Sequence, residues 1–368
     1  MFHVKHFFKG DSMKKEEPTH NYDEGFFNIM DYLKITEKNH KKPSIRIFAT
    51  NRSGGKTYSL LWYFIREFRA GNGQFVLEYR TRSEMLGVDS IFSCVAADKF
   101  PDMEITSIPI ASGIIRRIMN HDEIIGFAVS ISDCDKLKKY SPIFDNVKRA
   151  GMDEFQLEKT EDYLKNEVDK YLSVAYTISR GSGKQGKEVE FFLLGNSFSQ
   201  INPYLLQLGC YREKPDENGI IRGDSYIYVE TVNESAKKQT SELGISKAFA
   251  ENRHVQYATK NVGIYNDNEF IANLSGKSTY LLTFVQNGER FAIRECHKDN
   301  MLYINQKIDK DAKCFTLDNA DHGENTILLT RFSGLAQTLK EAYSQGQVRF
   351  CDLKSKDAFL HLIGREIF

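Results

Sequence analysis

A segment rich in glycine, followed by a lysine and a threonine, has the composition of a phosphate-binding loop. It consists of Asn51, Arg52, Ser53, Gly54, Gly55, Lys56 and Thr57. In such a loop, backbone N–H groups surround a phosphate, the lysine neutralises phosphate oxygens, and the threonine hydroxyl can bind Mg²⁺. Gly54 and Gly55 let the backbone approach the phosphate because they have no Cβ atom. The segment therefore predicts a site for a nucleoside triphosphate such as ATP.

The residues on both sides of this loop agree with the prediction. Residues 44–48 alternate as a strand does, and residues 58–70 have the length and apolar spacing of a helix. A strand, a loop and a helix in this order are the context that a phosphate-binding loop requires. One position departs from the pattern G-x-x-x-x-G-K-[ST], because Thr50 stands at the first glycine. The alternative interpretation is a chance Gly-Gly-Lys-Thr sequence in a surface turn.

An acidic pair, Asp153-Glu154, supplies the carboxylates that a site of nucleotide hydrolysis needs. Asp153 would hold Mg²⁺ through water, and Glu154 would orient and deprotonate the attacking water. The preceding residues 147–152 are a poor buried strand, because Lys148 and Arg149 interrupt the apolar run. An Asp-Glu pair is weak evidence alone, so the prediction depends on its position after the phosphate-binding loop.

Polar side chains also lie at the carboxyl ends of two other expected strands. The strand expected over residues 188–195 ends at Asn196, and the strand expected over residues 74–80 delivers Arg80 and Arg82. The carboxyl ends of strands in an open α/β sheet border the ligand site, so we expect Asn196 near the γ-phosphate. We expect the arginines at the same edge, with a solvated or paired charge as the alternative for one of them.

Arg180 follows an expected helix over residues 157–178 and begins a glycine-rich basic loop. This loop is similar in composition to a phosphate-binding loop, but a strand follows it instead of a helix. We therefore interpret Arg180 as an arginine finger that is offered to the nucleotide of a neighbouring subunit. A flexible, solvated loop is the alternative.

Two groups of lysines are candidates for contacts with nucleic-acid phosphates, which require no recognition of bases. The candidates are Lys136, Lys138, Lys139, Lys184 and Lys187. Clusters of this kind are more often solvated loops, and that alternative stays open.

The composition is that of an ordinary soluble protein without an excess of charge. The 368 residues include 50 Lys and Arg and 50 Asp and Glu, so any basic surface must be local. The six cysteines have no metal-ligand spacing, which predicts reduced core thiols in a cytoplasmic protein. No apolar run is long enough to cross a membrane, and the basic start is too short for a signal peptide.

The length of the chain predicts several domains rather than one core. We expect a flexible N-terminal arm over residues 1–21, with Met13 as an alternative natural start. An α/β domain with the phosphate-binding loop is expected over residues 22–207, including a hairpin over residues 113–131. A small linker domain over 208–262 follows, with one strand over residues 225–230 and a polar helical stretch over residues 233–252. The last expected unit is an α+β domain over 263–368, which begins with a hairpin around Gly288.

Several motifs occur in the same order as in a known family. They are Ala49 to Lys56 with Arg52, Gln74-Phe75 with Tyr79-Arg80, Phe100-Pro101-Asp102, Asp153-Glu154-Phe155, Gly195-Asn196-Ser197 with Asn202-Pro203-Tyr204, and Arg349-Phe350. Together they make the chain resemble the genome-packaging ATPases, or encapsidation proteins, of small protein-primed podoviruses, which are relatives of large terminases. The likeness extends over most of the chain.

The resemblance implies a P-loop (ASCE-type, RecA-like) ATPase domain with a mainly parallel sheet, a linker domain and a C-terminal RNase H-like domain. It implies that Lys56 and Thr57 of the Walker A loop bind phosphate and Mg²⁺, and that Asp153 is the Walker B acid and Glu154 the catalytic base. Arg180 stands at the position of the finger that acts in trans, and Asn196 at the motif that couples hydrolysis to movement.

The partners implied by the resemblance are double-stranded DNA and the portal (connector) of a procapsid. The protein would form a homo-oligomeric, pentameric ring in the host cytoplasm and act transiently at the portal vertex, with or without a structural packaging RNA. The C-terminal domain shows no set of acidic residues for two metal ions, so we expect a vestigial nuclease that grips DNA or RNA.

Two other functions stay open at this point. One is a different P-loop motor on nucleic acid, such as a helicase or a partition ATPase. The other is a non-hydrolysing nucleic-acid-binding protein with a degenerate loop, for which Thr50 is the strongest argument.

Overall fold

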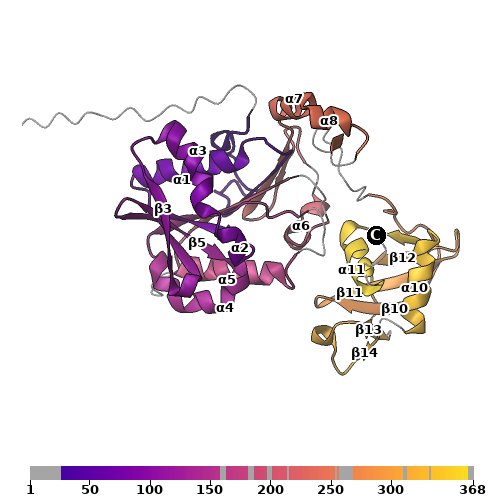
Figure 1. The fold of residues 1–368 in the computed structure, drawn as a ribbon. Helices are drawn as coiled ribbons and strands as arrows, with labels where there is room; N and C mark the ends of the chain where they lie inside the picture. Colours follow the sequence, from indigo (N-terminus) through magenta and orange to yellow (C-terminus); the bar gives the residue numbers. More distant parts are fainter. Residues whose placement is uncertain are drawn as a thin grey trace, which may run out of the picture.

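Two β-sheets form the centres of two domains (Figure 1). The computed structural model describes residues 26–157, 163–180, 186–196, 201–213, 215–252, 255–256, 268–309, 313–330 and 333–363. The expected arm over residues 1–21 and the candidate Lys184 lie outside these ranges. The first sheet has nine strands in the order β3-β4-β5-β2-β6-β7-β1-β9-β8, and the second has six in the order β14-β13-β10-β11-β12-β15.

The centre of the first sheet is parallel, as expected for a P-loop ATPase. The parallel strands are β1 (Ile45–Thr50), β2 (Gln74–Tyr79), β5 (Glu123–Ser130), β6 (Val147–Met152), β7 (Glu190–Asn196) and β9 (Tyr226–Thr231). Antiparallel strands border them: β3 (Ile105–Ile110), β4 (Ile115–Asn120) and β8 (Ile220–Arg222). The hairpin expected over residues 113–131 is therefore confirmed as β4 and β5. All parallel strands end at the same edge, which becomes the site.

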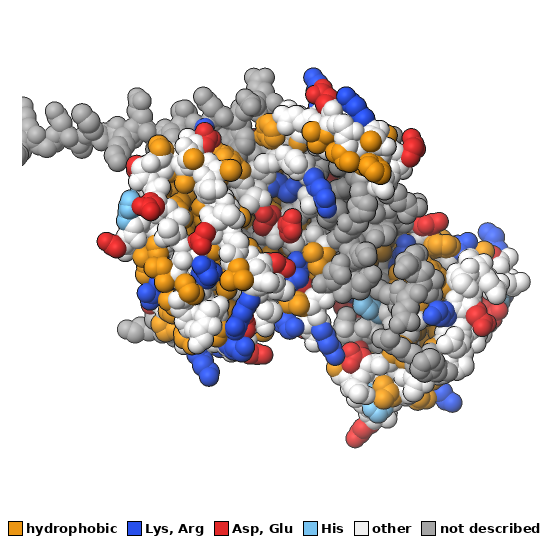
Figure 2. Space-filling view, viewed as in Figure 1, with side chains coloured by type: hydrophobic (Ala, Val, Ile, Leu, Met, Phe, Trp, Pro, Cys, Tyr) orange, Lys and Arg blue, Asp and Glu red, His pale blue; other side chains and the backbone are white. Residues whose placement is uncertain are grey.

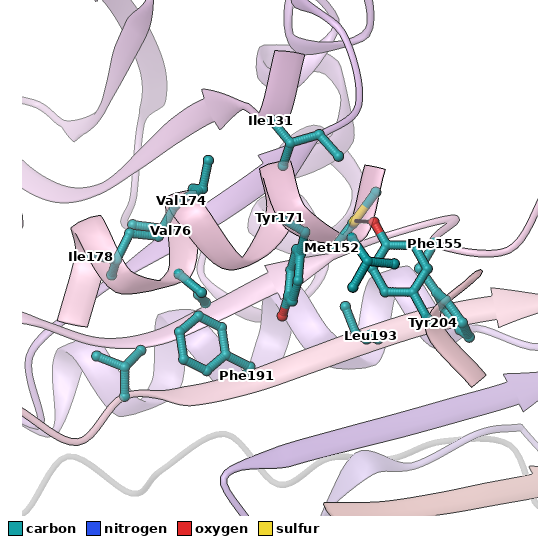
Figure 3. Packing of buried hydrophobic residues seen from close by; sticks show 14 of the residues in the cluster. Val76, Ile131, Met152, Phe155, Tyr171, Val174, Ile178, Phe191, Leu193 and Tyr204 are labelled. Carbon is teal, nitrogen blue, oxygen red and sulfur yellow. Dashed lines mark hydrogen bonds between the residues drawn. The ribbon is translucent and has the colours of Figure 1, made fainter. Parts of the chain in front are cut away.

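Helices cover both faces of this sheet, because alternate residues of a buried strand point to opposite sides. In β7, Phe192 and Leu194 pack with α1 (Lys56–Arg69) and α3 (Val88–Lys99). Phe191 and Leu193 point the other way and pack with α5 (Glu167–Arg180). Figure 3 shows this second layer, in which aromatic and aliphatic side chains from α5 lie against the sheet.

The interrupted strand before Asp153 is a regular member of the sheet. Arg149 is buried, yet its guanidinium donates to a Glu67 Oε2 atom at 2.7 Å and lies over the Tyr63 ring. Lys148 is exposed. The charges are thus paired or solvated, while Val147 and Met152 provide the apolar packing. The sequence pattern understated this strand because a partner on α1 was not visible in it.

The N-terminal sheet continues beyond residue 207, where the sequence suggested a separate linker domain. Strand β9 pairs in parallel with β1, and β8 pairs with β9. Residues 226–229 are all buried, so this segment completes the core of the first domain. The chain extends away from the sheet only after β9, in α7 (Glu234–Glu242) and α8 (Gly244–Ala248) (Figure 1).

The C-terminal domain has the expected α+β character. Its strands are β10 (Ser278–Gln286), β11 (Glu289–Cys296), β12 (Leu302–Asn305), β13 (Cys314–Thr316), β14 (Thr326–Leu328) and β15 (Val348–Phe350). The hairpin turn is confirmed, since Asn287 and Gly288 have φ of 52° and 74°. Strands β10, β11 and β12 form an antiparallel meander, and parallel strands flank it on both sides. The sheet packs against α10 (Gly334–Ser344) and α11 (Leu353–Ile363). This arrangement fits the RNase H-like prediction.

Four of the six cysteines are buried, as predicted, whereas Cys94 on α3 is exposed and Cys351 is partly exposed. None of the helices within the described ranges combines the length and the apolar character that crossing a membrane requires. The remaining short helices are α2 (Arg82–Met85), α4 (Cys134–Leu137) and α6 (Pro203–Leu208).

Candidate nucleotide-binding site

The loop between β1 and α1 has the backbone shape of an anion-binding nest. Ser53 and Gly55 have positive φ of 60° and 83°, which turns successive N–H groups towards one side. Helix α1 begins at Lys56 without a side-chain cap, so the N–H groups of its first turn remain for a ligand. Arg52 and Ser53 are exposed at the top of the loop. This geometry suits a phosphate group.

Thr50 occupies its unusual position without disturbing the loop. Its side chain is fully buried, and the hydroxyl donates to the Asn51 carbonyl at 3.0 Å. A Cβ atom on Gly54 would lie 2.9 Å from the Thr50 Oγ1 atom, so the threonine fits only because residue 54 is glycine. The departure from the motif is therefore accommodated by a glycine that the motif does not require.

Lys56 is buried and already engaged. Its ammonium donates to the Asn51 carbonyl and to Asn196 Oδ1, each at 3.1 Å, with the Thr50 carbonyl at 3.5 Å. Burial lowers the pKa of Lys56 to about 8, although the carboxylates of Asp153 and Glu154 oppose this shift. A buried cation beside a nest of N–H groups favours a ligand with negative charge.

Thr57 and Asp153 meet although 96 residues separate them in the chain. The Thr57 hydroxyl donates to Asp153 Oδ2 at 2.5 Å, and the other carboxylate oxygen accepts the Glu154 N–H at 3.0 Å. Burial raises the pKa of Asp153, and the bond from Thr57 opposes this shift. A hydroxyl and a carboxylate held together are the donor set that a P-loop site uses for Mg²⁺, so these residues fit the ion.

Glu154 lies exposed at the carboxyl end of β6 with a φ of 58°. A left-handed backbone is uncommon for a residue other than glycine and persists only where its surroundings hold it. Here the Arg80 guanidinium donates to the carbonyls of Glu154 and Phe155 at 3.3 and 3.1 Å. The expectation that Arg80 lies at the ligand edge is met, but its role is to hold the backbone of the acidic turn.

Arg80 is also half of a buried ion pair. Its Nε donates to both oxygens of Glu167 at 3.1 and 2.9 Å, and the Tyr204 hydroxyl donates to Glu167 at 3.0 Å. Glu167 belongs to α5 and Tyr204 to α6, so the pair ties both helices to the acidic turn. Arg82, the other arginine of that strand end, forms a more exposed pair with Asp133.

Arg180 lies at the opposite end of α5 from the Arg80–Glu167 pair. Helix α5 begins at Glu167 beside Arg80 and ends at Arg180, about 20 Å away at 1.5 Å per residue. The Arg180 guanidinium donates to the Lys138 carbonyl at 3.0 Å and to the Ser141 hydroxyl at 3.2 Å. The structure thus assembles Lys56, Thr57, Asp153 with Glu154 and Asn196, and separates Arg180 from them.

Of the four candidate lysines that the structure describes, Lys138 lies beside Arg180, whose guanidinium donates to its carbonyl. Lys136 pairs with Asp133 at 3.1 Å, Lys138 pairs with Asp135 at 2.7 Å, and Lys139 is exposed. Lys187 is turned inwards, where its ammonium donates to the Phe144 carbonyl, and burial lowers its pKa to about 8. An inward lysine of this kind is a weaker candidate for DNA than the exposed ones.

The contact of Asn233 with the phosphate-binding loop was not predicted from the sequence. Asn233, at the start of α7, exchanges hydrogen bonds with Asn51 and is 5% exposed. The only signal in the sequence was an asparagine at the expected start of a helix, which predicts a cap but not its contact with the loop.

Solved structures with similar folds come from packaging motors of bacteriophages. One is the viral genome packaging motor assembly of bacteriophage Phi-29, with 23% identity, a TM-score of 0.66 and coverage of 92% of this chain and 98% of that chain. Another is the Phi-28 gp11 DNA packaging motor, with 17% identity, a TM-score of 0.61 and coverage of 93% and 99%. These likenesses confirm the fold. The comparison with curated proteins found no match.

A family model described as Podovirus DNA encapsidation protein (Gp16) matches residues 34–366. The match extends from before β1 to the end of the described C-terminal helix, so both domains are included. It confirms the resemblance that the motifs predicted and the main functional interpretation, a phage protein that packages DNA, over a helicase, a partition ATPase or a different nucleic-acid-binding protein. The chain belongs to the family of podovirus DNA encapsidation proteins.

Proposed function

We propose that this protein hydrolyses ATP between the β1–α1 loop and the acidic turn, and that hydrolysis drives double-stranded DNA into a procapsid. The observation that supports this most directly is the hydrogen bond between Thr57 and Asp153. It joins the two halves of a hydrolysis site that come from distant parts of the chain. The exposed Glu154 next to this pair is free to face a water molecule at the γ-phosphate.

The residues have distinct roles in this proposal. The N–H groups of residues 53–57 and the Lys56 ammonium bind the β- and γ-phosphates. Thr57 and Asp153 would hold Mg²⁺, which neutralises charge on the phosphate oxygens when it is bound. Glu154 orients the attacking water and accepts its proton, while Arg80 keeps the Glu154 backbone in place.

Asn196 is suited to report whether nucleotide is bound. It holds the Lys56 ammonium at 3.1 Å, and phosphate oxygens would compete for the same ammonium. Binding of ATP therefore frees the Asn196 side chain, which lies at the end of β7 directly beside Thr50. This exchange of partners gives a physical basis for coupling hydrolysis to movement.

Arg180 would complete the site of a neighbouring subunit in a pentameric ring on the portal, in the host cytoplasm. Its place at the opposite end of α5 from Arg80, where it bonds to the Lys138 carbonyl, supports action in trans rather than in cis. The exposed Lys136, Lys138 and Lys139 would contact DNA phosphates, with or without a structural RNA bound to the ring.

The C-terminal domain would grip nucleic acid without cutting it. Among the residues that the structure describes, no three His, Cys, Asp or Glu side chains are grouped so that they could hold a metal ion. A nuclease of the RNase H-like kind needs such a group for its two ions. We therefore propose that the nuclease is vestigial.

The test is ATP hydrolysis with and without double-stranded DNA and empty procapsids. Glu154→Gln should abolish turnover but retain binding of ATP, because it removes the base and leaves the phosphate-binding loop intact. Lys56→Ala should lose both. Undiminished ATP hydrolysis by the Glu154→Gln variant would overturn the assignment of Glu154 as the base. A rate of ATP hydrolysis that double-stranded DNA does not change would overturn the proposed motor function.

A further inference from the structure

We propose that the contact between Asn51 and Asn233 positions the phosphate-binding loop and makes the α7–α8 segment (residues 233–249) responsive to bound nucleotide. The proposal rests on the proposed ATP site and adds a positioning residue, Asn233, that lies outside both nucleotide motifs. It also identifies the route by which the loop communicates with the segment after β9.

The Asn51 side chain is completely buried and uses both ends of its amide on one residue. Its Nδ2 donates to the Asn233 carbonyl at 3.1 Å, and its Oδ1 accepts the Asn233 N–H at 2.7 Å. In this pair one donor and one acceptor of the Asn51 amide meet the carbonyl and the N–H of the Asn233 backbone. The side chain of Asn51 is therefore committed to α7, so its part in nucleotide binding is to hold the loop.

The Asn233 side chain makes two further hydrogen bonds, one to α7 and one to the loop. Its Oδ1 accepts the Ala236 N–H at 2.7 Å and so caps α7, while its Nδ2 donates to the Gly54 carbonyl at 3.3 Å. The Gly54 carbonyl also accepts the Phe27 N–H at 2.9 Å. One asparagine thus joins the start of a helix to the residue that precedes Gly55 in the nest.

Among the described residues, few side chains of the α7–α8 segment are buried. Of the residues in α7 and α8, Ala236 and Ser246 are buried, and the large apolar side chains Leu243, Ile245 and Phe249 are 54%, 64% and 57% exposed. Figure 2 shows hydrophobic side chains on this part of the surface. A segment with little buried surface has a low local stability, so the Asn51–Asn233 contact helps to order its start.

The reciprocity of coupled equilibria links this contact to the bound nucleotide. If the contact stabilises the loop conformation that binds phosphate, bound nucleotide must stabilise the contact by the same free energy. ATP should therefore slow hydrogen exchange at the N–H groups in the first turns of α7, although α7 itself touches no phosphate.

The experiment compares ATP kinetics and hydrogen exchange in matched variants of the full chain. Asn51→Ala removes the pair from the loop side and keeps the α7 cap, whereas Asn233→Ala removes the cap and the bond to Gly54. Each should raise KM for ATP about three- to tenfold, the value of one or two hydrogen bonds, with kcat nearly unchanged. Asn51→Asp, which places a carboxylate oxygen against the Asn233 carbonyl beside the phosphate site, should weaken ATP binding at least as much as Asn51→Ala. The control is Ser333→Ala, which removes the cap of α10 in the other domain.

Hydrogen exchange separates positioning from a general loss of structure. ATP should slow exchange over residues 234–242 in the parent but not in Asn51→Ala, and without nucleotide Asn51→Ala should speed exchange there. Unchanged exchange of α7, or parental ATP affinity, in Asn51→Ala would overturn the proposal. If the parent binds ATP but shows no DNA-stimulated hydrolysis, the proposed motor function is wrong while these comparisons still decide the contact. If the parent protein binds no ATP, the hydrogen exchange of α7 measured without nucleotide is sufficient to decide whether the contact orders α7.

Discussion

Lys56 donates a hydrogen bond to Asn196 across 3.1 Å, from the first residue of α1 to the last residue of β7. The two residues flank Thr50, whose strand pairs with β7 so that Thr50 and Asn196 are direct neighbours. The contact links the residue that would neutralise phosphate charge to the residue that would signal its presence. Its strength should therefore depend on whether nucleotide is bound.

Asn196→Ala should separate hydrolysis from translocation. Lys56 keeps its bond to the Asn51 carbonyl in this variant, so ATP binding and basal hydrolysis should change by less than about threefold. DNA packaging should fall much more, because the exchange of partners at Lys56 is lost. The measurement is the ATP consumed per length of DNA packaged. Asn72→Ala, at the turn after α1, is the control, and a parallel loss of hydrolysis and packaging would contradict the prediction.

Thr50 and Gly54 should depend on each other. Gly54→Ala places a methyl group 2.9 Å from Thr50 Oγ1, and overpacking of this kind costs about 1–3 kcal/mol. Thr50→Ala removes that oxygen, so the double variant should recover part of the loss in stability and in ATP affinity. A double-mutant cycle measures the coupling, and strictly additive effects would show that the contact is unimportant.

Arg80 and Arg82 provide a matched comparison of buried and exposed ion pairs. Arg80→Ala leaves Glu167 buried without its partner and should cost about 3–5 kcal/mol, with a lower kcat because the Glu154 carbonyl is released. Arg82→Ala breaks a pair whose arginine is 42% exposed, and the buried Asp133 keeps Lys136 as a partner, so the cost should be at most about 1 kcal/mol. Urea unfolding followed by fluorescence of Trp62, the single tryptophan, reports on this domain. Equal costs would contradict the prediction.

Arg180 should act on a different subunit from its own Lys56. Arg180→Ala and Lys56→Ala should each lack DNA-stimulated hydrolysis, but a mixture of the two should regain part of it. In mixed rings, some intact loops meet intact arginines from the neighbouring subunit. Hydrolysis is measured across mixing ratios. Activity of Arg180→Ala alone would exclude a finger, and failure of every mixture would contradict action in trans.

Glu78 should make the stability of the N-terminal domain depend on pH. Its carboxyl is buried in β2 without a hydrogen-bond partner among the described residues, and burial raises its pKa to about 8. The unfolded chain loses this proton near its ordinary value of 4.5, whereas the folded protein keeps it. Stability should therefore fall as pH rises through this window, by up to about 1.4 kcal/mol per pH unit.

Glu78→Gln tests the assignment because it retains the shape of the side chain and cannot ionise. The variant should lose this part of the pH dependence and gain stability near pH 8, as measured by urea unfolding. Glu123→Gln, at the exposed start of β5, is the control. A parental profile in Glu78→Gln would show that another group is responsible.

Local patterns were sufficient to predict the elements of the site. Thr57, Asp153 and Asn196 each stand at the start of a helix or the end of a strand, and those positions follow from periodicity and turn residues. Once the elements belong to a parallel sheet, their carboxyl ends must share one edge. The site could therefore be predicted before any contact was known.

The remaining features depend on pairings between distant segments, which periodicity does not contain. Strand β9 was expected as a strand, but its place beside β1 could not be inferred from residues 225–230 alone. The partners of Arg80 and Arg149 likewise lie on other helices, so each looked like a free or disruptive charge. Asn51 and Asn233 are 182 residues apart, and neither residue type indicates the other.

The position of β1 between two parallel neighbours has a mechanical consequence. Each of its six residues pairs with β7 on one side and with β9 on the other. A force along the strands loads both ladders in shear, so that their hydrogen bonds resist together instead of opening one after another. A pull that starts at the nucleotide is thereby spread across the sheet rather than concentrated in the loop.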